Sequence, residues 1–113
     1  MGCLFCKIAG GEIPSEKVYE DDDVVAFRDI SPQAPVHILI IPRAHISGVD
    51  AAGPDAEVLL GRLLRVGARL AEKEGVGQSG YRLVINAGPD AGQAVFHLHC
   101  HLLGGRRLSW PPG

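Results

Sequence analysis

The sequence of 113 residues is poor in features that define several large classes of protein. Aromatic residues make up only 5% of it, so a core must be built mainly from Val, Ile, Leu and Ala. The three cysteines, Cys3, Cys6 and Cys100, form no spaced framework, which excludes a secreted disulfide scaffold. The longest apolar run, residues 38–41, is far short of the roughly 20 residues of a membrane helix, and no signal peptide is visible. We therefore expect a cytoplasmic protein with no membrane partner.

The chain also lacks a strong charge of one sign. Its formal net charge is −2, and this absence of a broad basic field argues against a nucleic-acid partner. Apolar residues make up 46% and charged residues 21%, the ordinary usage of a globular protein. The length suits one domain over residues 1–113, whose core would gain from a metal or a second subunit.

Short segments with helix or strand periodicity follow one another along the chain. We expect helices at residues 4–9 and from Pro54 to Gly75, and strands at residues 17–20, 24–29, 36–42, 81–87 and 95–103. The acidic residues 21–23 between the first two strands are read as a solvated turn. Strands joined by short turns predict an α+β fold, with one long and one short helix on an antiparallel sheet.

One glycine-rich segment imitates a nucleotide-binding loop. Residues 75–80 match G-x-G-x-x-G, which binds a pyrophosphate only where it follows a strand and opens a helix. Here the segment follows a helix and opens a strand, so we interpret it as a plain connection.

Three of the five histidines fall within five residues, at His97, His99 and His101. In a strand their side chains share one face about 7 Å apart, while Leu98 and Cys100 face the other way. Neighbouring imidazoles repel one another when protonated, so most should be neutral, with a free ring nitrogen. The three would span about 13 Å, too far to share one metal ion. Nucleophilic catalysis by one histidine therefore fits better.

A loop rich in glycine, residues 88–94, directly precedes these histidines. Glycine allows backbone N–H groups to converge on an anion, and the amide of Asn86 adds a neutral donor. A phosphate held by this loop would lie beside His99, whereas the alternative is an ordinary hairpin loop.

Residues 97–103 resemble the His-φ-His-φ-His-φ-φ signature of the histidine-triad (HIT) superfamily, in which φ is apolar. Residues 27–35, 41–47, 103–106 and 110–113 are similar to the Hint branch of that superfamily, so the resemblance covers nearly the whole chain. It implies a homodimer in which two five-stranded antiparallel sheets join into one.

The resemblance also implies hydrolysis of purine nucleoside phosphoramidates. His99 would attack the α-phosphorus and form a nucleotidyl-histidine, His101 would contact the phosphate and leaving group, and His97 would support the nucleophile's orientation. Two alternatives stay open. One is a dinucleoside polyphosphate hydrolase or nucleotidyltransferase of the same superfamily, and the other is a non-enzymatic module that binds nucleotide or zinc.

By the same resemblance, Asn86, Gly92 and the backbone of Ala94 would hold the phosphate, and Asp29 would accept from the ribose hydroxyls. The purine base would lie in a slot lined by Leu4, Phe5, Ile8, Phe27, Ile30 and Leu39. Trp110 would reach across the dimer towards the leaving group. Ala94 departs from the Ser that Hint members often carry, and leaves only a backbone N–H at that position.

Cys3 and Cys6 form C-x2-C, which is half of a structural zinc site. His37 and His97 are the candidates for the other two ligands, and some HIT proteins are similar in holding zinc in this way. The alternative is a hydrogen bond between the two histidines beside free thiols. His45, in a loop, is expected to be a capping or surface residue. The chemistry itself would need no cofactor.

Overall fold

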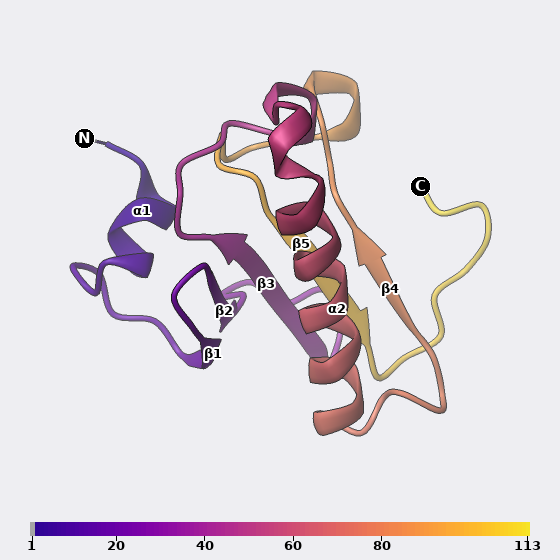
Figure 1. Cartoon of the computed structure of the whole chain (residues 1–113). Helices are drawn as coiled ribbons and strands as arrows, with labels where there is room; N and C mark the ends of the chain where they lie inside the picture. The colour runs from indigo at the N-terminus through magenta and orange to yellow at the C-terminus, as the bar shows by residue number, and fades with distance from the viewer. Residues whose placement is uncertain (1) are drawn as a thin grey trace.

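Five antiparallel strands form the frame of the molecule, which a computed structural model describes for residues 2–113 (Figure 1). The strands are β1 (Lys17–Glu20), β2 (Val24–Arg28), β3 (Val36–Pro42), β4 (Tyr81–Val84) and β5 (Cys100–Gly104), in the spatial order β1-β2-β3-β5-β4. Two α-helices, α1 (Leu4–Ala9) and α2 (Glu57–Lys73), accompany them. The expected α+β fold, with one short and one long helix on a five-stranded sheet, is confirmed.

The two helices cover opposite faces of the sheet. All seven residues of β3 are buried, because alternate side chains enter the core on each face. Ile38 and Ile40 join the larger apolar cluster beneath α2, whereas Leu39 and Ile41 join a smaller cluster with Phe5 of α1. The site described below lies on the α1 face.

Helix α2 lies close against the sheet because a glycine stands at the contact (Figure 1). A Cβ on Gly67 would lie 2.7 Å from Cδ2 of Leu83, well inside van der Waals contact. Pro54 belongs to a separate 3₁₀ turn, and Gly75, with φ of 80°, follows the helix in the left-handed conformation that glycine favours. No helix within residues 2–113 is long and apolar enough to cross a membrane.

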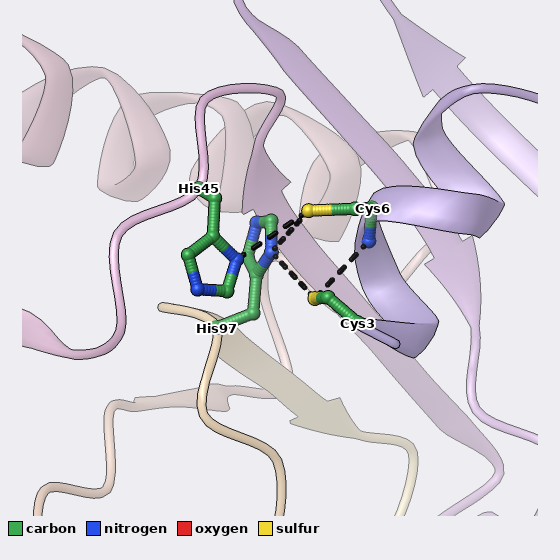
Figure 2. Close-up of side chains that lie close together, drawn as sticks. All are labelled: Cys3, Cys6, His45 and His97. Atoms are coloured by element: carbon green, nitrogen blue, oxygen red, sulfur yellow. Dashed lines mark hydrogen bonds between the residues drawn. The ribbon is translucent and has the colours of Figure 1, made fainter. Parts of the chain in front are cut away.

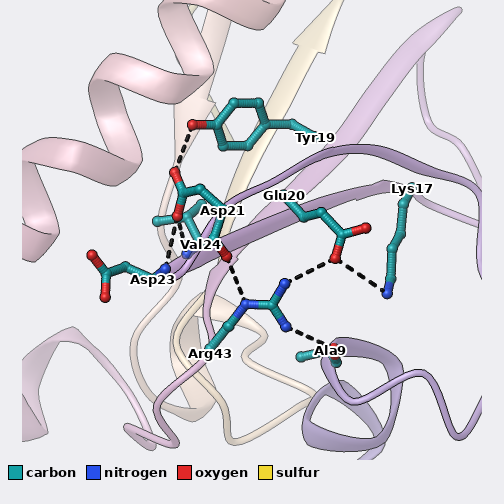
Figure 3. Close-up of polar contacts among 8 residues, drawn as sticks. All are labelled: Ala9, Lys17, Tyr19, Glu20, Asp21, Asp23, Val24 and Arg43. Carbon is teal, nitrogen blue, oxygen red and sulfur yellow. Dashed lines mark hydrogen bonds and ion pairs between the residues drawn. The ribbon is translucent and has the colours of Figure 1, made fainter.

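A polar network ties the turn between β1 and β2 to the end of α1 (Figure 3). Asp21 accepts backbone N–H bonds from Asp23 and Val24, so the acidic run forms a turn as expected. Arg43, just after β3, donates to the carbonyl oxygens of Asp21 (2.7 Å) and Ala9 (2.9 Å). It also contacts the Glu20 carboxylate at 2.8 Å. One guanidinium thus holds three segments together.

Replacing Arg43 with Ala is expected to lower the free energy of unfolding by about 2 kcal/mol, because the side chain makes three hydrogen bonds and is only half-buried. Urea denaturation measures the change. Arg65→Ala, on the outer face of α2, is the matched control, and an equal loss in both variants would contradict the role given to Arg43.

The last two strands are shorter than the sequence predicts. β5 begins at Cys100 rather than at residue 95, because the preceding backbone is bonded elsewhere. The N–H of Leu98 donates to the carbonyl of Ile46 at 2.6 Å, and the carbonyl of His97 accepts from a side chain. β4 ends at Val84, which pairs with His101, one residue from the start of β5.

Candidate active site

A mostly apolar cavity of about 290 Å³ opens between α1 and the sheet. All six residues of the expected base slot line it, together with Asp29. The cavity walls also include residues that the sequence interpretation missed, Ile13, Pro14 and Val95 among them. They come from loops, where no periodicity marks an inward-facing side chain. The cavity can take one planar apolar group, and the Asp29 carboxylate in its lining can accept hydrogen bonds from polar groups of that ligand.

His99 packs against Phe5, which lines this cavity, and its ring is held by the backbone of His97. Its Nδ1 lies 2.7 Å from the carbonyl oxygen of His97, and the residue is 7% exposed. A carbonyl only accepts, so Nδ1 must carry the proton and Nε2 keeps the lone pair. The ring packs edge-on against Phe5, with centroids 5.1 Å apart. His99 therefore presents an oriented nucleophilic nitrogen.

His101 and His37 form a pair whose protons are fixed in the same way. The N–H of Gln33 donates to Nδ1 of His37 at 3.0 Å, so the His37 proton must be on Nε2. That Nε2 lies 2.9 Å from Nδ1 of His101, which therefore accepts, and the His101 proton is on its own Nε2. His101 packs against His99 with ring centroids 4.9 Å apart, closer than the 7 Å expected along a flat strand. A ring N–H donor thus stands next to His99.

The ring of His97 faces the two cysteines (Figure 2). Its Nε2 donates to the carbonyl of Pro42 at 2.8 Å, which leaves the lone pair on Nδ1. Nδ1 lies 3.3 Å from Sγ of Cys3 and 3.6 Å from Sγ of Cys6. The backbone of His97, rather than its ring, therefore orients His99.

The fourth member of this cluster is His45, whose Nδ1 lies 3.4 Å from Sγ of Cys6. We call Cys3, Cys6, His45 and His97 the Cys–His quartet, since their four donor atoms all lie within 4.8 Å of one another. Zinc bonds of about 2.3 Å to sulfur and 2.0 Å to nitrogen give a tetrahedron with S–N edges of about 3.5 Å. The observed spacings match this, and a buried ligand ring bonded to a carbonyl is usual around zinc. The quartet fits zinc.

Two expectations are thereby corrected. His37 is not with the cysteines, because its position on β3 pairs it with β5 and directs its ring to His101. His45 takes the place in the quartet that was expected for His37, because the loop after Pro42 packs along His97 and Leu98. Spacing alone could not find this ligand. The sequence signal available was that His45 follows directly the strand that neighbours the histidine strand.

A second group, Asp29, His37 and His101, also brings its donor atoms within 4.8 Å. A metal on Nε2 of His37 would need the proton on Nδ1, where the N–H of Gln33 already points. Asp29 lies 3.5 Å from that Nε2 and accepts the N–H of Ser31 through its other oxygen. These contacts suit a proton-holding pair and not a metal site.

The loop that precedes the triad is held by a side chain that the sequence interpretation missed. Gln93 accepts the N–H of Gly88 and donates to the carbonyls of Ser47 and Val95. Gly92, with φ of 79°, donates its N–H to Pro89 at 3.0 Å, and would have to share it with a phosphate. Within residues 2–113 the Ala94 N–H has no backbone partner. Asn86 is half-buried at the start of the loop.

Similarity to known proteins agrees with this arrangement. The sequence profile of the HIT domain matches residues 10–108. This chain belongs to the HIT domain family. A purine nucleoside phosphoramidase of Escherichia coli strain K12 is 54% identical to it over 105 residues, which cover 93% of this chain and 88% of that protein. The resemblance stated from the sequence is confirmed.

Solved HIT structures share the fold closely. A HIT family hydrolase from Legionella pneumophila superposes with a TM-score of 0.97 at 53% identity, covering 99% of this chain and 100% of the other. A histidine triad nucleotide-binding protein from Candida albicans gives a TM-score of 0.82 at 34% identity, covering 97% and 83%.

The HIT histidines should make stability depend on pH. Burial, followed by the charges of His99 and His37, lowers the pKa of His101 to about 4. Between the unfolded value of 6.5 and 4, the unfolded chain binds a proton that the folded chain rejects. Stability is therefore expected to fall by about 2 kcal/mol as the pH drops from 7 to 4. Urea midpoints across this range measure it, and His101→Asn should flatten the curve. An unchanged slope would contradict the assignment.

Zinc is expected to bind this HIT protein once per chain. Burial and the neighbouring thiol of Cys3 raise the pKa of Cys6, so binding should release protons and weaken at low pH. Removing the metal with a chelator should lower Tm by about 10 °C. Elemental analysis and calorimetry measure both quantities. His45→Asn should reduce zinc content and His37→Asn should not, and the reverse result would restore the ligand set expected from the sequence.

Proposed function

We propose that this HIT protein hydrolyses the P–N bond of purine nucleoside phosphoramidates, of the adenylate–amine or adenylate–lysine type, through a nucleotidyl intermediate on His99. The observation that carries the proposal is the fixed orientation of His99. Its Nδ1 is bound to the carbonyl of His97, so Nε2 is free as the nucleophile. The name of the E. coli relative, a purine nucleoside phosphoramidase, supports the same substrate class.

The nucleoside would occupy the cavity beside His99. Its apolar walls, with the edge-on pair of Phe5 and Phe27 at 5.5 Å, suit a purine ring. Asp29 at the rim can accept from ribose hydroxyls, because a carboxylate is an acceptor only. Asn86 and the N–H of Ala94 would then meet the phosphate next to the nucleophile.

The reaction divides into two displacements at phosphorus. Nε2 of His99 attacks phosphorus, the P–N bond breaks, and the departing nitrogen takes a proton from solvent while it accepts a hydrogen bond from the Nε2–H of His101. Water then attacks the nucleotidyl-His99 and gives its proton back to solvent. The nucleoside monophosphate leaves, and His99 is free again. His37 keeps the His101 proton on the side that faces the substrate.

Zinc on the Cys–His quartet would hold α1 on the sheet and supply folding energy. Every step at phosphorus is assigned to the chain's own histidines. We place the reaction in the cytoplasm, where reducing conditions keep Cys3 and Cys6 as thiols.

We further propose that two copies pair through β4. This strand is one of the two edges of the sheet, and its four residues are only half-buried. Large apolar side chains are exposed on the single chain, including Val58 of α2 and Trp110, which is 82% exposed. A second copy would cover them and bring its Trp110 towards the leaving-group side. Light scattering should give twice the mass of one chain, and a monomer that is fully active would contradict this.

A substrate panel tests the activity. Adenosine 5′-phosphoramidate and an adenylate–lysine conjugate should be hydrolysed in preference to a dinucleoside polyphosphate at equal concentration. AMP binding without turnover of either phosphoramidate would favour the non-enzymatic module. Faster cleavage of the dinucleoside polyphosphate would favour the other branch of the superfamily.

A further inference from the structure

Helix α1 belongs to both sites at once. Cys3 and Cys6 contribute two donor atoms to the Cys–His quartet (Figure 2). Leu4, Phe5 and Ile8 of the same segment line the nucleoside cavity. The metal centre and the cavity therefore share one short element of structure.

This helix depends on tertiary contacts for its existence. It has six residues, and isolated helices shorter than about 12 residues are marginal in water. Its first turn is capped by Sγ of Cys3, which accepts the N–H of Cys6 at 3.4 Å. Its last turn is held by Arg43 at the carbonyl of Ala9. Whatever binds Cys3 therefore acts on the end of the helix that carries Leu4 and Phe5.

Phe5 makes a direct connection between the two sites. The ring is 5% exposed and meets His97, a member of the quartet, edge-on at 6.0 Å. It meets His99 edge-on at 5.1 Å, with an interplanar angle of 87°. It also packs edge-on against Phe27, which lines the same cavity. A shift of Phe5 would therefore change both the wall of the cavity and the packing of His99.

We propose that metal occupancy of the Cys–His quartet and nucleotide occupancy of the cavity are thermodynamically coupled through α1, with Phe5 as the positioning residue. The metal orders α1 before the nucleotide binds, so nucleotide binding no longer includes the entropy cost of ordering this helix. Coupling of this kind is reciprocal, and the nucleotide raises metal affinity by the same factor. The inference rests on the proposed function only for the identity of the nucleotide.

Calorimetric titration of AMP into the full chain tests the coupling. The zinc-loaded protein should bind AMP about tenfold more tightly than the chelator-treated protein. In the reciprocal experiment, competition with a chromophoric chelator should show zinc held about tenfold more tightly when AMP is saturating. Hydrogen exchange should report greater protection of the amides of α1 with zinc bound.

Two variants separate coupling from ordinary loss of contact. Phe5→Leu keeps both cysteines and an apolar wall but removes the ring between His97 and His99. We expect its AMP affinity to become nearly independent of zinc. Leu4→Ala is the matched control, because Leu4 lines the same cavity from the same helix and is 45% exposed. It should weaken AMP binding in both forms and preserve the tenfold ratio.

The contrary outcomes are distinct. Equal AMP affinity with and without zinc, or failure of zinc to bind, overturns the coupling and leaves the proposed hydrolysis standing. Loss of the whole sheet signal in circular dichroism on chelation also overturns it, because the metal would then act on the entire fold. Absence of AMP binding in every form overturns the coupling together with the proposed function.

Discussion

Replacing His99 with Ala is expected to abolish phosphoramidate hydrolysis, with kcat lowered by about 10⁴-fold or more. The reason is that Nε2 of His99 is the only nitrogen assigned to form a bond with phosphorus. The neighbours do not substitute for it, since Nδ1 of His101 is bonded to His37 and the His97 ring faces the cysteines. Steady-state turnover of adenosine 5′-phosphoramidate measures the loss.

The same experiment can detect the intermediate. Wild-type protein quenched during turnover should carry a nucleotidyl adduct, which mass spectrometry of the digest should place on His99. The variant should carry none and should still bind AMP, because the cavity and Asp29 are unchanged. His99→Gln, of similar size, guards against an effect of the void left by Ala. An adduct on His101, or full activity of either variant, would refute the assignment.

Replacing His37 with Leu should lower kcat by about 10²-fold and leave the affinity for AMP within about threefold of that of the wild type. Leu removes the N–H that donates to Nδ1 of His101, so the His101 proton is free to move to Nδ1. In that tautomer Nε2 no longer donates to the departing nitrogen. The pH profile of kcat should change as well, because the charge of His37 contributes to lowering the pKa of His101 and Leu carries no charge.

His37→Gln is the matched control, because its side-chain amide can still donate a hydrogen bond to His101. We expect it to retain most of the activity that Leu removes. If both variants lose activity equally, the packing of the His37 ring matters and its hydrogen bond to His101 does not. If neither does, the tautomer of His101 is fixed by something else.

The local sequence pattern predicted helices and strands well where the flanking residues and the packing of the element agree with that pattern. The short helix and the strand at residues 36–42 have the expected bounds, because each is closed by a glycine or proline and is apolar towards the core. The prediction was wrong for residues 95–99. Their alternating pattern is that of a strand, but their backbone groups bond to Ile46 and to the ring of His99 instead of to a neighbouring strand.

The family resemblance named six residues for a base slot, and the structure brings these six together in one cavity. The members of the Cys–His quartet could be predicted only by residue type. The sequence offered two cysteines and a choice of histidines, and nothing in the spacing separated His37 from His45. That choice depends on which loop packs beside His97, which is a contact between residues about 50 positions apart.

The sequence by itself determined the chemistry available to this protein: three histidines at alternate positions, a glycine-rich loop before them and two cysteines one helical turn apart. Histidines at every second position marked the segment where this chemistry should be sought. Only the tertiary structure decided what each ring does. Donor and acceptor roles follow from the partner of each nitrogen, and here the partners are Pro42, His97 and Gln33, whose carbonyl and N–H groups are placed by the fold. The three histidines look alike in the sequence, but the tautomers of His97 and His99 are fixed by backbone carbonyls, and that of His101 is fixed by His37.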